Sequence, residues 1–166
     1  MTEEVSAKVF INVPLSAAWD KLQDISLAHN YVPGIINTEI VSAQSKGIGA
    51  SRHVYRNKSS YIQETVEEWR DGEGFLIRLH KGEKSAPPFK NAWFRYALRD
   101  CGSGRTELTT TLIYEMPLGA LGAWIGSKMS NFVRSTIADV AVSMKLYYEN
   151  EQPTTPAILR DYKAQL

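Results

Sequence analysis

The sequence has almost no cysteine: Cys101 is the only one among 166 residues. A single thiol cannot form an internal disulfide, so a small secreted scaffold held together by disulfides is excluded. The N-terminal residues Met-Thr-Glu-Glu are acidic and have none of the features of a signal peptide. Together these features predict a cytoplasmic protein.

The chain also lacks an excess of charge of one sign and any long apolar run. It carries 19 basic and 18 acidic residues, which gives a formal net charge of +1. This balance argues against a nucleic-acid-binding protein, because such proteins need a strongly basic surface. No apolar stretch approaches the ~20 residues that a membrane-spanning helix requires. We therefore expect neither a nucleic-acid partner nor a membrane span.

Recognisable metal and catalytic motifs are missing as well. The three histidines, His29, His53 and His80, are far apart, and none belongs to a pair with the spacing of a zinc site. No Gly-x-Ser-x-Gly nucleophile elbow is present. The glycines of residues 47–49 precede a predicted strand, whereas a dinucleotide fingerprint opens a helix. The sequence thus predicts no metal and no cofactor.

What the chain does contain is a run of strand patterns that predicts an α+β protein. A first strand over residues 5–12 is followed by two short helical segments, over about 17–24 and near 27–31. Glycine and proline turns then separate further strands, and the connections are too short for helical crossovers, so the sheet must be antiparallel. These strands are predicted over residues 35–43, 48–56, 60–70, 75–81, 89–100 and 105–116.

The chain then forms one long amphipathic helix, predicted over residues 120–149. Its apolar side chains recur at spacings of three and four, which gives one broad apolar face. At 1.5 Å per residue this helix is about 45 Å long, enough to cross a small domain. We expect a single domain over residues 1–149, followed by a tail over 150–166 with one or two helical turns.

This order of elements resembles the helix-grip fold of the START-like superfamily, which includes the birch pollen allergen, polyketide aromatase/cyclases and coenzyme-Q-binding proteins. The resemblance covers about residues 5–149 and implies a curved, seven-stranded antiparallel sheet wrapped on the C-terminal helix, with a sheltered apolar cavity between them. The segments that carry it are Pro14 to Trp19, Asp24, Tyr31-Val32-Pro33-Gly34, Gly47 to Arg52, Glu64 to Trp69, and Tyr114 to Gly119.

The first functional hypothesis is a module that binds or carries a hydrophobic small molecule such as a lipid, an isoprenoid quinone or a polyketide. Burial of apolar ligand surface would drive binding. Both a monomer and a homodimer are compatible with the sequence. The predicted walls are Phe75, Ile77, Phe94, Tyr96, Leu112 and Tyr114 from the strands, and Met129, Val133, Ile137 and Met144 from the helix.

The second hypothesis is a polyketide aromatase/cyclase or dehydratase. Such an enzyme needs an acid, a base and a donor for the developing oxyanion, close together in the cavity. The residues that we assign to these roles are Tyr96 as the acid, Glu67 as the base and Arg52 as the group that stabilises an enolate. This hypothesis requires the three side chains to converge.

The Arg52 side chain can point either into the cavity or to solvent. Two of the predicted strands have no cleanly apolar face, as expected where polar groups point into a cavity. An inward Arg52 needs an acid such as Glu67 or an anionic ligand group, because a lone buried charge is costly. In the alternative, Arg52 and Arg56 lie on the solvent face and pair across strands with Glu64 or Glu68.

Overall fold

The computed structural model describes residues 1–117 and 120–166 and confirms the α+β class. Residues 118–119, at the end of one segment that carries the family resemblance, lie outside the described residues. One antiparallel sheet has the strand order β1-β8-β7-β5-β4-β3-β2, and a short strand β6 pairs with β5. The strands are β1 (Thr2–Ile11), β2 (Asn37–Ile40), β3 (Ser51–Tyr55), β4 (Tyr61–Arg70), β5 (Gly74–Lys81), β6 (Lys84–Ser85), β7 (Asn91–Gly102) and β8 (Arg105–Glu115).

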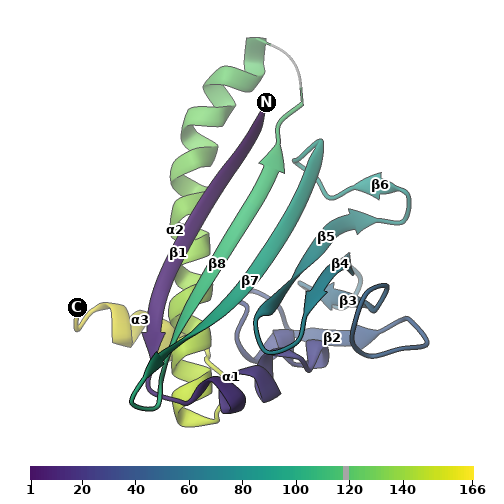
Figure 1. Ribbon diagram of the computed structural model, residues 1–166. Helices are drawn as coiled ribbons and strands as arrows, with labels where there is room; N and C mark the ends of the chain where they lie inside the picture. Colours follow the sequence, from purple (N-terminus) through teal and green to yellow (C-terminus); the bar gives the residue numbers. More distant parts are fainter. Residues whose placement is uncertain (118–119) are drawn as a thin grey trace.

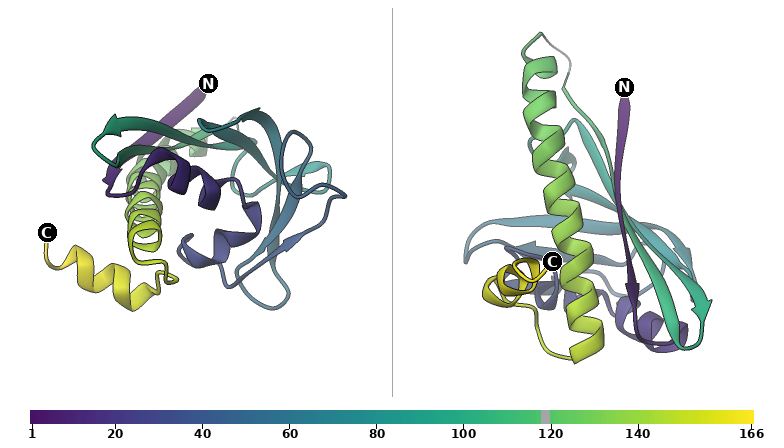
Figure 2. Two further views of the ribbon diagram at one scale, coloured as in Figure 1. Left: turned by 60° about the horizontal axis from the view of Figure 1, so that its bottom comes forward. Right: turned by 90° about the vertical axis from the view of Figure 1, so that its left-hand side faces the viewer.

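The helices occupy one side of this sheet. Two short ones follow β1, and the long α2 comes after β8, so the predicted order of elements is confirmed (Figure 1). The sheet curves around α2, with α1 and η1 near the C-terminal end of that helix (Figure 2). Their bounds are α1 (Leu15–Leu22), the 3-10 helix η1 (Ile25–Asn30), α2 (Ala120–Asn150) and α3 (Pro156–Lys163).

The core lies between the concave face of the sheet and α2. Strand β7 alternates cleanly between buried and half-buried side chains, as expected for a sheet with one buried face, whereas β5 and β8 also bury residues of their other face. On α2 the buried residues Val133, Ile137, Val140 and Met144 recur at spacings of three and four. The apolar stripe of α2 therefore packs against the buried face of the sheet.

Strand β4 departs from simple alternation. Its register with β5 shifts between Val66 and Glu68, where a β-bulge inserts one extra residue. Before the bulge Val66 points inward, and after it Trp69 does, stacking on the ring of Phe75 with centroids 5.3 Å apart. The extra residue, Glu67, is exposed. The bulge therefore decides which carboxylates of β4 can reach the interior.

The strand pair β5–β7 depends on glycine at position 74. Gly74 has a φ of +141°, and a Cβ there would lie 2.0 Å from the backbone oxygen of Tyr96. Gly72, in the same turn, has a φ of +77°, and a Cβ at that position meets nothing within 4 Å.

We therefore expect Gly74→Ala to be far more destabilising than Gly72→Ala. The Gly72 variant should lower the free energy of unfolding by about 1 kcal/mol, the cost of a left-handed backbone for alanine. The Gly74 variant should lower it by about 1–3 kcal/mol more, because the new methyl group collides with the neighbouring strand. Urea denaturation of both variants measures the difference, and equal losses would contradict this account of the strand contact.

Candidate functional site

A cavity of about 830 Å³ lies between α2 and the sheet, and we call it the helix–sheet cavity. Six of the ten wall residues predicted from the sequence are found in its lining: Phe94, Tyr96, Leu112, Met129, Val133 and Ile137. They come from β7, β8 and α2. Whether these residues bind a ligand stays a prediction.

The structure places the other four predicted wall residues in the core, outside this lining, and this corrects their expected positions. Phe75 and Ile77 are buried on β5, and Phe75 packs against Trp69. The ring of Tyr114 packs against that of Phe89, with centroids 5.1 Å apart, and the Tyr114 hydroxyl donates a hydrogen bond to the Glu3 carboxylate. Met144 is fully buried on α2, one turn before the tyrosines at its C-terminal end.

Two loops complete the wall of the cavity, and sequence reasoning missed both. One follows η1 and contributes Val32 to Ile35, and the other precedes β7 and contributes Ala86 to Phe89. In the sequence, the Pro33-Gly34 and Pro87-Pro88 pairs predicted only that the chain breaks at these points. They did not predict that the neighbouring apolar residues face inward. Inward-facing Val54, Ile62 and Leu79 of β3, β4 and β5 were missed as well.

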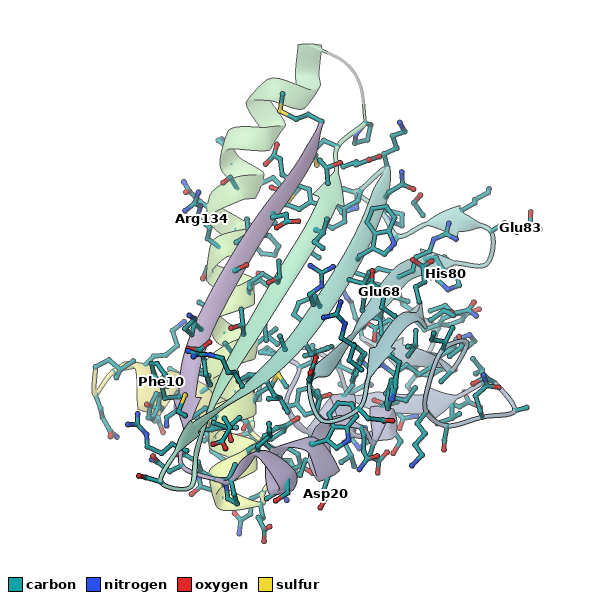
Figure 3. The ribbon with its side chains drawn as sticks, in the orientation of Figure 1. Phe10, Asp20, Glu68, His80, Glu83 and Arg134 are labelled. Carbon is teal, nitrogen blue, oxygen red and sulfur yellow. The ribbon has the colours of Figure 1, made fainter. Side chains whose placement is uncertain are left out.

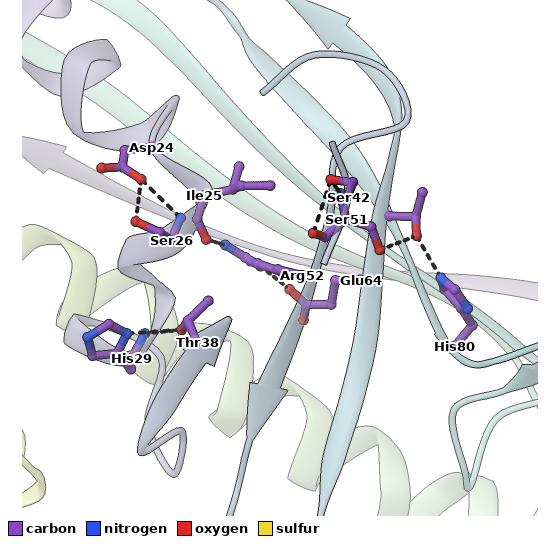
Figure 4. A network of polar contacts seen from close by, with 11 residues as sticks. Asp24, Ile25, Ser26, His29, Thr38, Ser42, Ser51, Arg52, Glu64 and His80 are labelled. Atoms are coloured by element: carbon purple, nitrogen blue, oxygen red, sulfur yellow. Dashed lines mark hydrogen bonds and ion pairs between the residues drawn. The ribbon is translucent and has the colours of Figure 1, made fainter. Parts of the chain in front are cut away.

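Arg52 is buried, with 1% of its surface exposed, and pairs with Glu64 of the cavity lining. Its Nε atom donates to Oε2 of Glu64 at 2.6 Å, and Nη1 donates to the backbone oxygen of Ile25 at 2.6 Å (Figure 4). Arg52 and Glu64 are directly opposed on β3 and β4. Burial lowers the pKa of Arg52, but the Glu64 carboxylate more than offsets this and raises the pKa above its usual value.

Three tyrosines surround this ion pair, and together with Arg52 and Glu64 we call them the arginine–tyrosine cluster: Tyr31, Tyr96 and Tyr148. Burial raises the pKa of each phenol, and the charge of Arg52 opposes this only in part, so all three stay protonated at neutral pH. Glu64 and Tyr96 belong to the cavity lining.

The cluster holds more donors than it satisfies. Among the described residues, Nη2 of Arg52 and the hydroxyls of Tyr31 and Tyr148 are buried and have no hydrogen-bond partner. Such orphaned polar groups are uncommon in a folded protein, because each costs roughly 1–3 kcal/mol of lost hydration. The cluster can therefore stabilise an oxygen atom that accepts hydrogen bonds.

The three predicted catalytic residues do not converge, and the expected position of Glu67 is wrong. Arg52 and Tyr96 come together in the cluster. Glu67 is exposed and accepts a hydrogen bond from Nε1 of Trp93 at 2.9 Å, because it directly follows the inward-facing Val66 and so points to the opposite face of the sheet. The inner carboxylate is Glu64 instead.

The alternative arrangement, with Arg52 on the solvent face of the sheet, predicted the correct partner for Arg52 but the wrong face of the sheet. Arg52 pairs with Glu64, as that alternative supposed, but the pair points inward. Arg56 is exposed and lies at the cavity lining. Glu68 is on the outer side of the sheet, away from α2, 3.8 Å from Arg95 (Figure 3).

A second hollow, of about 760 Å³, lies beside the turn between β4 and β5. It is lined by both core and surface residues, including Trp69, Arg95 and Arg99. Arg99 donates to the Glu107 carboxylate at 2.7 Å, so its charge is already paired. The lining of the helix–sheet cavity is more apolar and includes Glu64, which pairs with the buried Arg52. The helix–sheet cavity is therefore the better candidate site.

The described part of the chain offers little for a metal ion. Within it, no three histidine, cysteine, aspartate or glutamate side chains gather as metal ligands would. The same residues contain no helix that is both long and apolar enough to cross a membrane.

Solved structures with the same fold cover nearly the whole chain. An aromatase/cyclase, ZhuI of Streptomyces sp. R1128, has a TM-score of 0.64 at 12% identity, covering 91% of this chain and 98% of that one. The protein XoxI of Bacillus cereus has a TM-score of 0.70 at 12% identity, covering 89% and 96%. Ara h 8.0201 has a TM-score of 0.54 at 14% identity, covering 86% and 99%. At these identities the likeness shows the fold alone, which is the predicted helix-grip fold.

Sequence comparison adds the family. No curated protein matches the chain significantly. The family described as "Polyketide cyclase / dehydrase and lipid transport" matches residues 2–149, which confirms the START-like resemblance. The chain therefore belongs to the polyketide cyclase/dehydrase and lipid transport family, whose members' fold and description point to hydrophobic ligand binding or polyketide-cyclase-type chemistry.

Proposed function

We propose that this protein binds a hydrophobic small molecule whose polar end carries a neutral keto or enol oxygen, as in a polyketide or an isoprenoid quinone. The observation that carries this proposal is a largely apolar cavity that borders the arginine–tyrosine cluster. Glu64 and Tyr96 line the cavity, and Glu64 holds Arg52, whose Nη2 atom is buried and unpartnered. Apolar walls with a few convergent polar groups are the usual composition of a small-molecule site.

The apolar walls supply most of the affinity. A cavity of about 830 Å³ falls within the range of ligand pockets, roughly 300–1,000 Å³. Burial of apolar ligand surface contributes about 25 cal/mol per Å² before the costs of ordering and lost motion. Met129 suits such a wall, because its flexible side chain adapts to ligands of different shape.

The arginine–tyrosine cluster supplies orientation, and its charge selects the polar group. One cation, Arg52, is already balanced by one anion, Glu64, and the tyrosines are neutral. A carboxylate would bring an uncompensated negative charge into a buried site, which is costly. A keto or enol oxygen accepts hydrogen bonds from Nη2 of Arg52 or the Tyr31 hydroxyl without adding charge.

A second candidate function is a polyketide-cyclase-type reaction, which the presence of Arg52 beside Tyr96 favours. Arg52 would stabilise an enolate, and Tyr96, which its raised pKa keeps protonated near neutral pH, would donate a hydrogen bond to the same oxygen. Neither carboxylate of the cavity lining is free to act as the base. Glu64 and Asp139 are the carboxylates of the cavity lining, and each is already paired, with Arg52 and Lys163 respectively. We therefore place binding first.

The cavity is tested by filling it. Val133→Trp puts a large side chain into the lining and should weaken binding of an apolar fluorescent probe, 2-ethylnaphthalene, by at least about tenfold, because the apolar contact area is lost. Ala138→Trp, on the exposed side of the same helix, is the matched control. Fluorescence titration measures both, with circular dichroism to verify folding. Unchanged uptake by a folded Val133 variant would rule out this cavity as the site.

The polar end is tested with a shape-matched ligand pair, 2-acetylnaphthalene and 2-ethylnaphthalene, which differ in one carbonyl group. The wild type should prefer the ketone. The double variant Arg52→Met/Glu64→Met should reduce that preference and still bind 2-ethylnaphthalene, because the Arg52 donor is gone while the Tyr31 and Tyr148 hydroxyls and the apolar walls remain. An undiminished preference in the double variant would show that the carbonyl does not bind at Arg52.

The same pair of residues gives a stability prediction. Arg52→Met alone leaves Glu64 without its buried partner and should lower the free energy of unfolding by about 3 kcal/mol. The double variant should recover most of that loss, because two apolar side chains then replace the ion pair. Urea denaturation compares the single and double variants. Equal stability of the two would mean that solvent screens Glu64 in the single variant.

A further inference from the structure

The tail that follows α2 is hydrogen-bonded to two parts of the fold at once. The N–H of Thr154 donates to the backbone oxygen of Asn30 at 2.8 Å, and its Oγ1 donates to the backbone oxygen of Ser143 at 2.8 Å. Asn30 is the last residue of η1, and Ser143 lies in α2. Thr154 therefore joins η1 to α2.

Both ends of η1 are fixed in this way. At its first residue, the backbone oxygen of Ile25 accepts from Arg52, and at its last, the backbone oxygen of Asn30 accepts from Thr154. The Asn30 side chain also donates to the hydroxyl of Tyr147 at 3.3 Å. The residue that follows η1 is Tyr31, so the hydrogen bond from Thr154 acts one residue away from a member of the arginine–tyrosine cluster.

The other anchor of Thr154, Ser143, lies on the helix that carries Tyr148. Ser143 lies one turn before Tyr147 and five residues before Tyr148 on α2. The ring of Tyr31 stacks on that of Tyr147, with centroids 5.9 Å apart, and meets that of Tyr148 edge-on at 6.2 Å. A shift of η1 against α2 would therefore separate the two unpartnered hydroxyls of Tyr31 and Tyr148.

The rest of the tail keeps Thr154 in place. Helix α3 folds back beside α2 (Figures 1 and 2), buries Leu159 and pairs Lys163 with Asp139 of α2 at 2.6 Å. None of these tail residues belongs to the segment 2–149 that matches the family. The tail therefore lies outside the matched segment and contacts both η1 and α2.

We propose that Thr154 is a positioning residue, which sets the Tyr31 and Tyr148 hydroxyls at the distance that a bound keto or enol oxygen requires. This inference rests on the proposed function. Hydrogen bonds weaken steeply with poor geometry, and a binding site must hold its groups within about 0.5 Å. A tether between the two elements that carry the donors supplies that precision.

The chain offers a matched set of variants for the test. Thr154→Val keeps the shape and the N–H but loses the bond to Ser143, whereas Thr154→Ser keeps both bonds. Thr155→Val is the control, because the Thr155 hydroxyl accepts from the N–H of Ile158 and caps only α3. Binding of 2-acetylnaphthalene and 2-ethylnaphthalene is measured for each variant by fluorescence titration.

We expect Thr154→Val to reduce the preference for the ketone by about three- to tenfold, the effect of one misplaced hydrogen bond. Thr154→Ser should restore the preference, and Thr155→Val should leave it within twofold of the wild type. Equal weakening of both ligands by Thr154→Val would overturn the proposal, because it would show a purely structural role. An unchanged preference, or the same loss in Thr155→Val, would overturn it as well.

A second measurement separates this inference from the proposed function. In protein without ligand, hydrogen exchange of the Tyr31 and Val32 amides, which both donate to the Ala28 oxygen, reports how firmly η1 is held. Thr154→Val should speed this exchange about tenfold, and Thr155→Val should not. If the wild type shows no preference for the ketone, the proposed function is wrong, and the exchange result alone decides: faster exchange supports the positioning of Tyr31, and unchanged exchange overturns it.

Discussion

The buried ion pair between Arg52 and Glu64 is the contact on which the rest of the site depends. It joins β3 to β4, and the bond from Nη1 of Arg52 to Ile25 ties η1 to both strands. Neither charge could stay in this interior alone, because an unpaired buried charge costs several kcal/mol. The pair thus explains why a full cation can lie beside an apolar cavity, with one of its nitrogens still able to donate.

The shape of the fold places this polar group beside the cavity. The curved sheet leaves space against α2 that side chains do not fill, and the loops after η1 and before β7 complete the wall. Because the walls are apolar along most of their length, a ligand gains affinity from its hydrocarbon part almost independently of its chemistry. The cluster then distinguishes one end of the ligand from the other. Affinity and orientation come from different elements of the fold.

The fold and the central wall were predictable from the sequence because their periodicities are clean. Phe94 and Tyr96 lie on a strictly alternating strand, and Val133 and Ile137 lie on an amphipathic stripe, so their faces follow from spacing alone. Glu67 was misplaced because a β-bulge shifts the alternation by one residue, and nothing local in the sequence marks that shift. Tyr31 was predicted as the end of a short helical segment before the Pro33-Gly34 break, and Tyr148 as one more apolar residue of the long helix. Their partnership is tertiary: segments more than 100 residues apart meet at Arg52.

Stability and catalysis make opposite demands on Glu64. A general base must be free to accept a proton from the ligand, and Glu64 is the carboxylate closest to the unpartnered donors. Its oxygen is held by Arg52 at 2.6 Å, so taking up a proton would weaken the pair that keeps Arg52 buried. Tyr31, Tyr96 and Tyr148, with raised pKa values, serve as donors and not as bases near neutral pH. The arrangement is therefore suited to holding an oxygen atom in place more than to removing a proton beside it, and a reaction here would require the ligand to supply the base or Arg52 to change partner.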